Sequence, residues 1–199
     1  IDGISFIDIN NRLYRLKIFG DHNLQNISGA LNICKALGVE SEDFYNAITS
    51  FNGESNRLEL VYKSSDTIIF KDFAHSPSKV KATTEAVRKQ FSNRKLISFF
   101  ELHTYSSLNP LFLEKYKDTL KHSDECYIYY SEKNMRIKRL EPIDSELIIR
   151  SFNHRCLTVI DNYEKLNEKI YDLDLSNSVL LMMSSGKFGG LDIDKIKKT

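Results

Sequence analysis

The chain has 199 residues and a formal net charge of +1, with 41% apolar, 28% charged and 11% aromatic side chains. That length accommodates one full domain, or one domain and part of another. The aliphatic and aromatic content excludes a disordered chain. Because 28 basic residues balance 27 acidic ones, no overall charge attracts nucleic acid or an anionic membrane surface. We therefore expect neither of these as a partner.

The sequence carries no sign of membrane insertion or export. Its longest apolar runs, such as residues 179–183, fall far short of the ~20 residues that span a bilayer, and its first residues lack the apolar region of a signal peptide. The three cysteines, Cys34, Cys126 and Cys156, are widely spaced and form no CxxC pair. We expect them to be small buried side chains in a reducing cytosol, which predicts a cytoplasmic protein.

The first elements are a hairpin and a helix. Apolar residues alternate over 4–9 and 13–18, and Asn10 and Asn11 between them tolerate the positive φ of a tight turn, which predicts a strand, a turn and a second strand. Over residues 24–37 apolar side chains recur every three or four positions, which predicts a helix that Gly38 ends.

A shorter helix and a polar segment follow. We predict an N-cap at Ser41 and a helix that runs through Ile48. Residues 51–56 are polar and show no periodicity, which indicates a hinge between two structural units.

Beyond the hinge, short apolar runs alternate with amphipathic helical segments. The runs cover residues 67–73, 95–100, 125–130, 156–160 and 178–184. The helical segments lie near residues 78–91, 110–121, 144–152, 162–172 and 192–198. Continuous apolar strands are typical of a sheet that is covered on both faces. We therefore predict an α/β fold, a Rossmann-like, mainly parallel sheet flanked by helices.

Three loops at the carboxyl ends of predicted strands carry candidate binding residues, because ligands of such sheets lie beyond those ends. In the first loop, Asp72 either binds ribose hydroxyls or caps the following turn, and His75 either reaches a phosphate or is merely exposed. The second loop places His103, Thr104 and Tyr105 where they bind a carboxylate or phosphate, or simply face solvent. The third, residues 184–190, is glycine-rich and either approaches an anion or makes a tight turn.

Other candidates lie earlier in the chain. Asn23 and Asn26 share one face at the start of the first long helix. Paired amides there suit a planar heterocycle such as adenine. Alternatively, Asn23 caps the helix. Arg57 is either a phosphate contact or a surface charge. The chain contains no GxxxxGK[ST] phosphate loop, since Lys187 follows a glycine without the rest of that motif.

Five of these motifs occur in register: Gly20–Asn26, Ala30, Phe51–Gly53, Asn56–Glu59 and Asp72–Pro77. In this order and spacing the chain resembles the ATP-dependent Mur ligases, the amide-forming synthetases of peptidoglycan precursors, and in particular the branch that recognises UDP-N-acetylmuramate. The resemblance covers nearly the whole chain. It implies that residues 1–53 are the end of a central ATP-binding domain, a hairpin with helices, and that residues 54–199 are the C-terminal domain.

The resemblance also implies roles for individual residues. By position, the adenine contacts are His22, Asn23 and Asn26, the ribose and phosphate contacts are Arg57 and Asp72, and His75 lies beside the phosphate tail. The loops implied for the acceptor substrate contain His103, Thr104, Tyr105, Ser107, Ser185, Gly186 and Lys187. The family uses ATP with Mg²⁺ and proceeds through an acyl phosphate. Its phosphate loop and most magnesium ligands would lie upstream of this sequence, so we expect the chain alone to be inactive without the missing domains.

The chain departs from the family at several positions. Ser76 stands where a second histidine is usual. Thr104 and Ser107 replace arginines that the alanine-adding branch uses for a free amino-acid carboxylate, which argues against L-alanine as acceptor. Residues 183–190 are similar to the closing segment of the murein-peptide ligases, so a tripeptide acceptor is our first choice. L-Alanine is the alternative. A related ligase of folate or another acid and a non-catalytic α/β binding domain are the remaining hypotheses.

Overall fold

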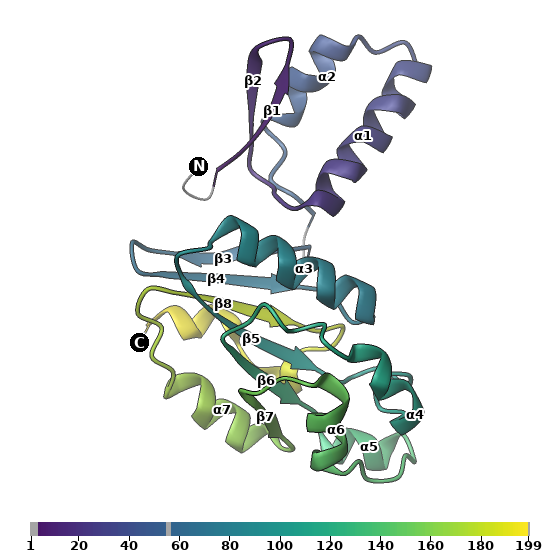
Figure 1. Cartoon of the computed structure of the whole chain (residues 1–199), viewed down its shortest axis with the longest axis vertical. Coiled ribbons are helices and arrows are strands. Elements are labelled where there is room, and N and C mark those ends of the chain that lie inside the picture. Colours follow the sequence, from purple (N-terminus) through teal and green to yellow (C-terminus); the bar gives the residue numbers. More distant parts are fainter. Residues whose placement is uncertain (1–3, 55–56, 199) are drawn as a thin grey trace.

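The computed structural model describes residues 4–54 and 57–198. It has two parts, a small N-terminal unit of a hairpin and two helices, and a larger domain built on one sheet with helices on both faces (Figure 1). The hinge predicted at residues 51–56 falls between them, and residues 55 and 56 lie outside the described residues. The predicted α/β class is confirmed.

The N-terminal unit begins with the antiparallel strands β1 (Ser5–Ile9) and β2 (Arg12–Leu16). Asn10 and Asn11 between them have φ values of 52° and 65°, the left-handed backbone that the sequence predicts for this turn. Helices α1 (Asp21–Ala36) and α2 (Ser41–Ile48) follow.

The N-terminal unit has a small core and one departure from prediction. Leu16, Ile27 and Phe44 form its buried cluster. Ser41 was expected to cap α2, but Glu40 occupies the N-cap position and no side chain caps the helix. The acidic first turn, with Glu42 and Asp43, stabilises this helix start through its dipole instead.

The larger domain holds a six-stranded sheet in the order β3-β4-β8-β5-β6-β7. Its strands are β3 (Glu59–Lys63), β4 (Thr67–Asp72), β5 (Lys95–Glu101), β6 (Glu125–Tyr129), β7 (Leu157–Ile160) and β8 (Ser178–Met183). Neighbouring strands run parallel except for β3, which pairs antiparallel with β4 at the edge. The apolar runs did not predict β3, because its alternating, half-exposed residues resemble a loop with scattered apolar side chains.

Helices cover both faces of the sheet (Figure 1). They are α3 (Pro77–Gln90), α4 (Pro110–Leu113), α5 (Glu132–Ile137), α6 (Ser145–Phe152) and α7 (Tyr163–Tyr171). The core of one face includes Val80 and Val87 from α3 and Phe152 from α6, and the core of the other includes Leu166 and Ile170 from α7. No helix among the described residues is long and apolar enough to cross a membrane.

Three local predictions need correction. The helix expected over residues 110–121 ends early, because α4 passes into a 3-10 helix (Glu114–Tyr116) and Asp118 then has a φ of 59°. Asp118 turns away because its N–H donates to Phe152 O (3.1 Å). The helix expected near 192–198 is a 3-10 helix, Ile193–Lys198. Cys156, expected to be buried, is exposed, while Cys126 is buried as predicted.

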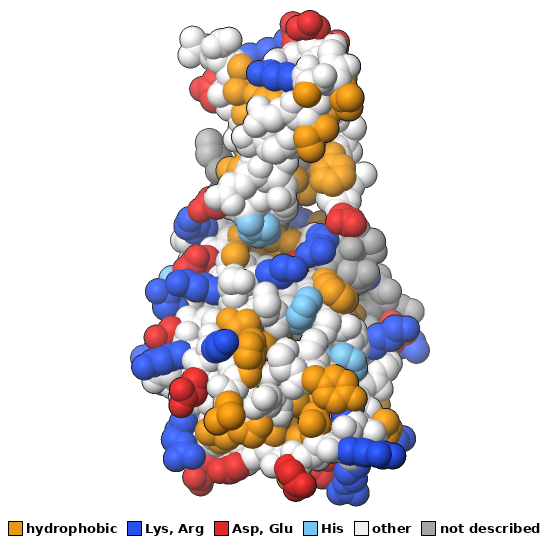
Figure 2. All heavy atoms as spheres, turned by 90° about the vertical axis from the view of Figure 1, so that its right-hand side faces the viewer, with side chains coloured by type: hydrophobic (Ala, Val, Ile, Leu, Met, Phe, Trp, Pro, Cys, Tyr) orange, Lys and Arg blue, Asp and Glu red, His pale blue; other side chains and the backbone are white. Residues whose placement is uncertain are grey.

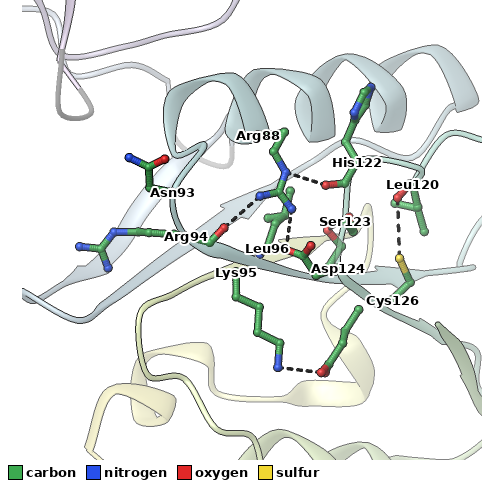
Figure 3. A network of polar contacts seen from close by, with 12 residues as sticks. Arg88, Asn93, Arg94, Lys95, Leu96, Leu120, His122, Ser123, Asp124 and Cys126 are labelled. Carbon is green, nitrogen blue, oxygen red and sulfur yellow. Dashed lines mark hydrogen bonds and ion pairs between the residues drawn. The ribbon is translucent and has the colours of Figure 1, made fainter.

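A polar network joins α3 to the amino-terminal ends of β5 and β6 (Figure 3). Arg88 donates from Nε to His122 O (2.8 Å), from Nη1 to Arg94 O (2.9 Å) and from Nη2 to Asp124 Oδ2 (2.6 Å). Asp124 Oδ2 also accepts from Leu96 N (2.7 Å). One guanidinium thus joins three segments at the amino-terminal ends of the strands. The predicted site loops lie at the opposite, carboxyl ends.

Candidate functional site

The three predicted loops meet at the carboxyl ends of β4, β8 and β5, which are neighbours in the sheet. In the parallel register Met183 lies beside Asp72 on one side and beside Phe100 on the other. The loops after these strands therefore emerge side by side, as expected for a parallel sheet.

A cavity of about 750 Å³ lies at the junction between the N-terminal unit and the sheet domain; we call it the junction cavity. Its volume is within the range of small-molecule sites. It brings together five of the six predicted nucleotide residues, which are His22, Asn23, Asn26, Arg57 and Asp72. On the face of the molecule shown in Figure 2, histidine and basic side chains gather below the narrow junction.

The start of α1 positions the two asparagines on the wall of the junction cavity. Asn23 Nδ2 donates to Phe19 O (2.8 Å), which fixes the amide plane and turns this side chain back onto its own helix start. Asn26, one turn later, is exposed. The expected shared face is present, and Gly20 rather than Asn23 occupies the N-cap position.

Asp72 ties the end of the hinge to the sheet. The side chain is buried, and its Oδ2 accepts from Leu58 N (2.6 Å) while Oδ1 accepts from Ala74 N (2.6 Å). The bond to Ala74 is the turn cap that the sequence left open as one of two roles. The bond to Leu58 holds a residue with a φ of 47° beside Arg57, so Asp72 also positions the arginine.

Arg57 and His75 both lie near the Phe73 ring. The Arg57 guanidinium carbon is 6.0 Å from the ring centroid, and the His75 ring meets Phe73 edge-on at 5.2 Å. His75 Nδ1 is 2.9 Å from Phe73 O, and Tyr116 Oη donates to His75 O (2.5 Å). His75 is absent from the described lining of the junction cavity, so its predicted place beside a phosphate tail stays a prediction.

Helix α3 adds residues that the sequence analysis did not single out for binding. Ser78 and Lys79, in its first turn, line the junction cavity with Ala82 and Thr83. The unpaired N–H groups of a helix start and a lysine are both suited to an anion. Pro77 at the first helical position, directly after the Asp72 loop, is the sequence signal that points to this helix start.

A second cavity, of about 860 Å³, lies over the ends of β5 and β8; we call it the loop cavity. It contains four predicted acceptor residues, His103, Ser185, Gly186 and Lys187. Asp72 lines both cavities, which places them next to each other. Ser184, the first residue of the third predicted loop, also lines this cavity. Lining residues that the sequence analysis did not single out for binding include Glu101, Asn134 and Asp192.

The other predicted acceptor residues lie outside the described lining of the loop cavity. Thr104 Oγ1 accepts from Ser107 N (3.1 Å) and donates to Ser107 Oγ (3.0 Å), so these two hydroxyls close their own loop. Tyr105 is 62% exposed, with Lys138 Nζ 4.4 Å from its ring centroid. Contacts of these three residues with an acceptor remain predictions.

Buried polar groups lie in and beside the loop cavity, with Tyr129 Oη packed against the backbone of Gly189. Burial raises the pKa of Tyr129, and the charge of Glu101 adds to that shift. Ser185 Oγ is buried and has no hydrogen-bond partner within the described part of the chain. Among the described residues, no three His, Cys, Asp or Glu side chains are grouped so that they could hold a metal ion.

Phe19 and an exposed ion pair connect the two parts of the molecule. The Phe19 ring packs edge-on against Phe70 at 5.5 Å and Phe91 at 5.8 Å, inside the core of the sheet domain. Lys89 Nζ donates to Asp21 Oδ2 at 2.7 Å between α3 and α1. That hydrogen bond and the charge of Lys89 lower the pKa of Asp21.

Comparison with known proteins places this geometry in context. No family model matches the chain. Over 197 residues it is 30% identical to the UDP-N-acetylmuramate–L-alanine ligase of Prochlorococcus marinus, an alignment that covers 91% of this chain and 39% of the relative. The chain thus spans about two fifths of that relative's length.

Two solved structures share the fold. A UDP-N-acetylmuramate–alanine ligase from Thermotoga maritima superposes with a TM-score of 0.69 at 17% identity, covering 89% of this chain and 37% of that one. A murein peptide ligase from Psychrobacter arcticus superposes with a TM-score of 0.65 at 19% identity, covering 99% and 42%. At these identities the two structures support a shared fold only, and the sequence relative supports common ancestry. The chain belongs to the Mur ligase family.

Proposed function

We propose that the chain supplies nucleotide contacts and the acceptor loops of an ATP-dependent ligase that joins an amino acid or a peptide to UDP-N-acetylmuramate. The main support is the junction cavity, which gathers His22, Asn23, Asn26, Arg57 and Asp72 from three separate segments of the chain. A related sequence named for the same substrate, UDP-N-acetylmuramate, adds to that support.

The residues of the junction cavity fit an adenine nucleotide. The Asn26 amide is exposed, has no hydrogen-bond partner among the described residues, and both donates and accepts, as the edge of adenine requires. Arg57 and Lys79 provide positive charge for phosphate oxygens, and the first turn of α3 adds N–H donors. When bound, ATP supplies the phosphoryl group that activates the substrate carboxyl. The part of these residues is to orient the nucleotide and to stabilise its charge. We place the Mg²⁺ ligands mostly in the remainder of the ligase.

The N-terminal unit supports our division into residues 1–53, the end of a central ATP-binding domain, and residues 54–199, the C-terminal domain. Leu13, Ile33 and Leu37 are 63%, 65% and 78% exposed, and the buried cluster of this unit is small. A concentration of exposed apolar side chains is typical of a surface that packs against other protein. We assign that surface to contact with the rest of the central domain.

L-Alanine and a tripeptide are the two candidate acceptors. The name of the sequence relative favours L-alanine, which was our alternative. The absence of arginine from residues 101–109 favours the tripeptide, our first choice, because a free amino acid offers the site little besides its carboxylate. Lys187, exposed at the loop cavity, is a cation that either acceptor could use for a carboxylate.

An assay of the complete ligase tests the proposal. This chain, joined to the remainder of its ligase, is mixed with ATP, Mg²⁺ and UDP-N-acetylmuramate, and ADP release is measured with L-alanine or with L-alanyl-γ-D-glutamyl-meso-diaminopimelate. We expect release to depend on one of the two acceptors. Arg57→Met should raise the KM for ATP by about tenfold to a hundredfold, as expected for the loss of a hydrogen bond to a charged group, while Arg150→Met, an exposed control on α6, should not.

The result also decides between the remaining hypotheses. Release with L-alanine alone assigns the alanine-adding reaction, and release with the tripeptide alone assigns the murein-peptide reaction. Absence of release with both acceptors contradicts the proposal and leaves two hypotheses, a ligase of folate or another acid and a non-catalytic binding domain.

A further inference from the structure

Glu101 is a buried carboxylate at the floor of the loop cavity. It ends β5, its residue is 2% exposed, and it lies at the centre of contacts with the loop that follows β8. Its Oε2 accepts from Ser184 Oγ and from Phe188 N (2.9 Å). A charge this deeply buried needs a partner of opposite charge or several hydrogen bonds.

His103 is the side chain that faces this carboxylate. Its Nδ1 is 3.5 Å from Glu101 Oε1, and the imidazole is 35% exposed on the wall of the loop cavity. The backbone of Gly186 packs against the same side of the ring, since a Cβ at that position would lie 2.7 Å from His103 Nδ1. Nδ1 is thereby enclosed, and Nε2, across the ring, has no protein hydrogen-bond partner among the described residues.

This arrangement suits a base better than an anion receptor. The negative charge of Glu101 offsets a positive charge on His103, so the pair attracts a substrate carboxylate weakly. Lys187, at the same cavity, has no ion-pair partner within the described residues and is the better receptor for that group. An acceptor amine, by contrast, is mostly protonated at neutral pH and has no free electron pair until a base removes a proton.

The geometry points to His103 as the catalytic base for the acceptor amine, with Glu101 as the residue that positions it; this inference rests on the proposed function. Glu101 keeps the proton of the neutral imidazole on Nδ1 and leaves the Nε2 electron pair free. Nε2 takes one proton from the acceptor's ammonium group. The freed electron pair of the amine then forms a C–N bond to the acyl phosphate carbon. The C–O bond to phosphate breaks, and phosphate leaves with the electrons of that bond. The second proton on nitrogen passes to phosphate or water.

Apart from Lys187, the other titratable groups in or beside the loop cavity are engaged elsewhere. Lys71 pairs with Glu59 (3.2 Å), and Asp192 pairs with Lys195 (3.3 Å). Asp72 accepts from two backbone N–H groups. Tyr129, whose pKa is raised by burial, stays protonated at neutral pH. With Lys187 left as the cation for a substrate carboxylate, His103 is the remaining described residue of this cavity with a free basic atom.

Two nucleophiles test the inference in the complete ligase. The proposed amino-acid or peptide acceptor arrives protonated, whereas hydroxylamine is largely unprotonated at neutral pH and needs no base. For His103→Gln we expect a loss of about a hundredfold or more in turnover with the acceptor, the range of general base catalysis, and hydroxamate formation within about threefold of wild type. Glu101→Gln keeps one acceptor oxygen but removes the charge. It should lower turnover with the acceptor by less than His103→Gln does and should likewise leave hydroxamate formation near the wild-type rate.

His122→Gln is the matched control, because His122 also lies 3.5 Å from a glutamate, Glu85, and is also 35% exposed. It should leave both reactions unchanged. Equal losses with both nucleophiles in His103→Gln would assign the histidine a structural role, and full activity with the acceptor would remove it from catalysis; either result overturns the inference. A wild-type ligase that releases no ADP with either nucleophile would instead contradict the proposed function.

Discussion

Gly186 lies where the two loops of the loop cavity leave no room for a side chain. A Cβ there would be 2.7 Å from His103 Nδ1 and 2.8 Å from Glu101 Oε2. We expect Gly186→Ala to displace the histidine and to lower the free energy of unfolding by about 1 to 3 kcal/mol, as overpacking does. Urea denaturation measures the change.

Gly29 provides the matched control for that substitution. It lies inside α1 with nothing within 4 Å of an added Cβ, so Gly29→Ala should stabilise the protein by about 0.5 to 1 kcal/mol through helix propensity. If Gly186→Ala also stabilised the protein, that result would contradict the close packing of Gly186 against Glu101 and His103.

Residue types alone revealed part of the site. The sequence pointed to His103, Asp72 and the two asparagines, because they follow strand ends or share a helix face. It did not point to Glu101, which looks like the polar end of an apolar run. The partners that make Glu101 distinctive, Ser184 and Phe188, are 83 and 87 residues away, and only the pairing of β5 with β8 brings them close.

At the scale of elements, Arg88 joins α3 to the start of two strands (Figure 3). Burial raises the pKa of Asp124, but hydrogen bonds from Leu96 N and Arg88 and the charges of Arg88 and Lys95 outweigh it and lower the pKa overall. A carboxyl with a lowered pKa stabilises the fold above its unfolded-state pKa, and this contribution is lost as the pH falls through the folded-state value.

We therefore expect Arg88→Met to cost about 2 to 4 kcal/mol at pH 7, the combined value of its hydrogen bonds to carbonyl and carboxylate groups. The difference from wild type should shrink as the pH falls below about 4, the ordinary pKa of an aspartate in an unfolded chain, toward the lower folded-state pKa of Asp124. Chemical denaturation from pH 7 to pH 3 gives both quantities. A difference that stays constant over this range would show that the Asp124 contact contributes nothing.

Most of the order of elements in the sheet domain could be predicted from the alternation of apolar runs with segments of helical periodicity. The helix over 110–121 was not, because buried Leu113, Tyr116 and Leu120 recur at helical spacing while the backbone is not helical beyond Tyr116. Contacts of Asp118 with Phe152 and Asn153 determine the turn there. Periodicity reports which side chains are buried, and a chain can bury them without a helix.

At the scale of the whole molecule, Phe19 is the apolar link between the N-terminal unit and the sheet domain. Because its ring is buried against Phe70 and Phe91, Phe19→Ala should lower the free energy of unfolding by about 3 to 5 kcal/mol. Lys89→Met removes the neighbouring ion pair with Asp21, which is exposed to solvent, and should leave stability unchanged.

Urea denaturation of the two variants, with NMR relaxation of both units, checks this assignment. The N-terminal unit of Phe19→Ala should tumble more independently of the sheet domain than that of wild type. A larger loss of stability in Lys89→Met than in Phe19→Ala would mean that charge rather than packing joins the two parts and shapes the junction cavity.

The central claim is that the junction cavity binds an adenine nucleotide. Its most direct test is a titration of the ¹⁵N-labelled chain with ADP at millimolar concentration, followed by heteronuclear NMR. We expect weak binding, with chemical-shift changes at Asn23, Asn26, Arg57 and the first turn of α3. The Arg88 network, at the amino-terminal ends of the strands, should show no chemical-shift changes. Shifts confined to that network, or none at the junction, would contradict the claim.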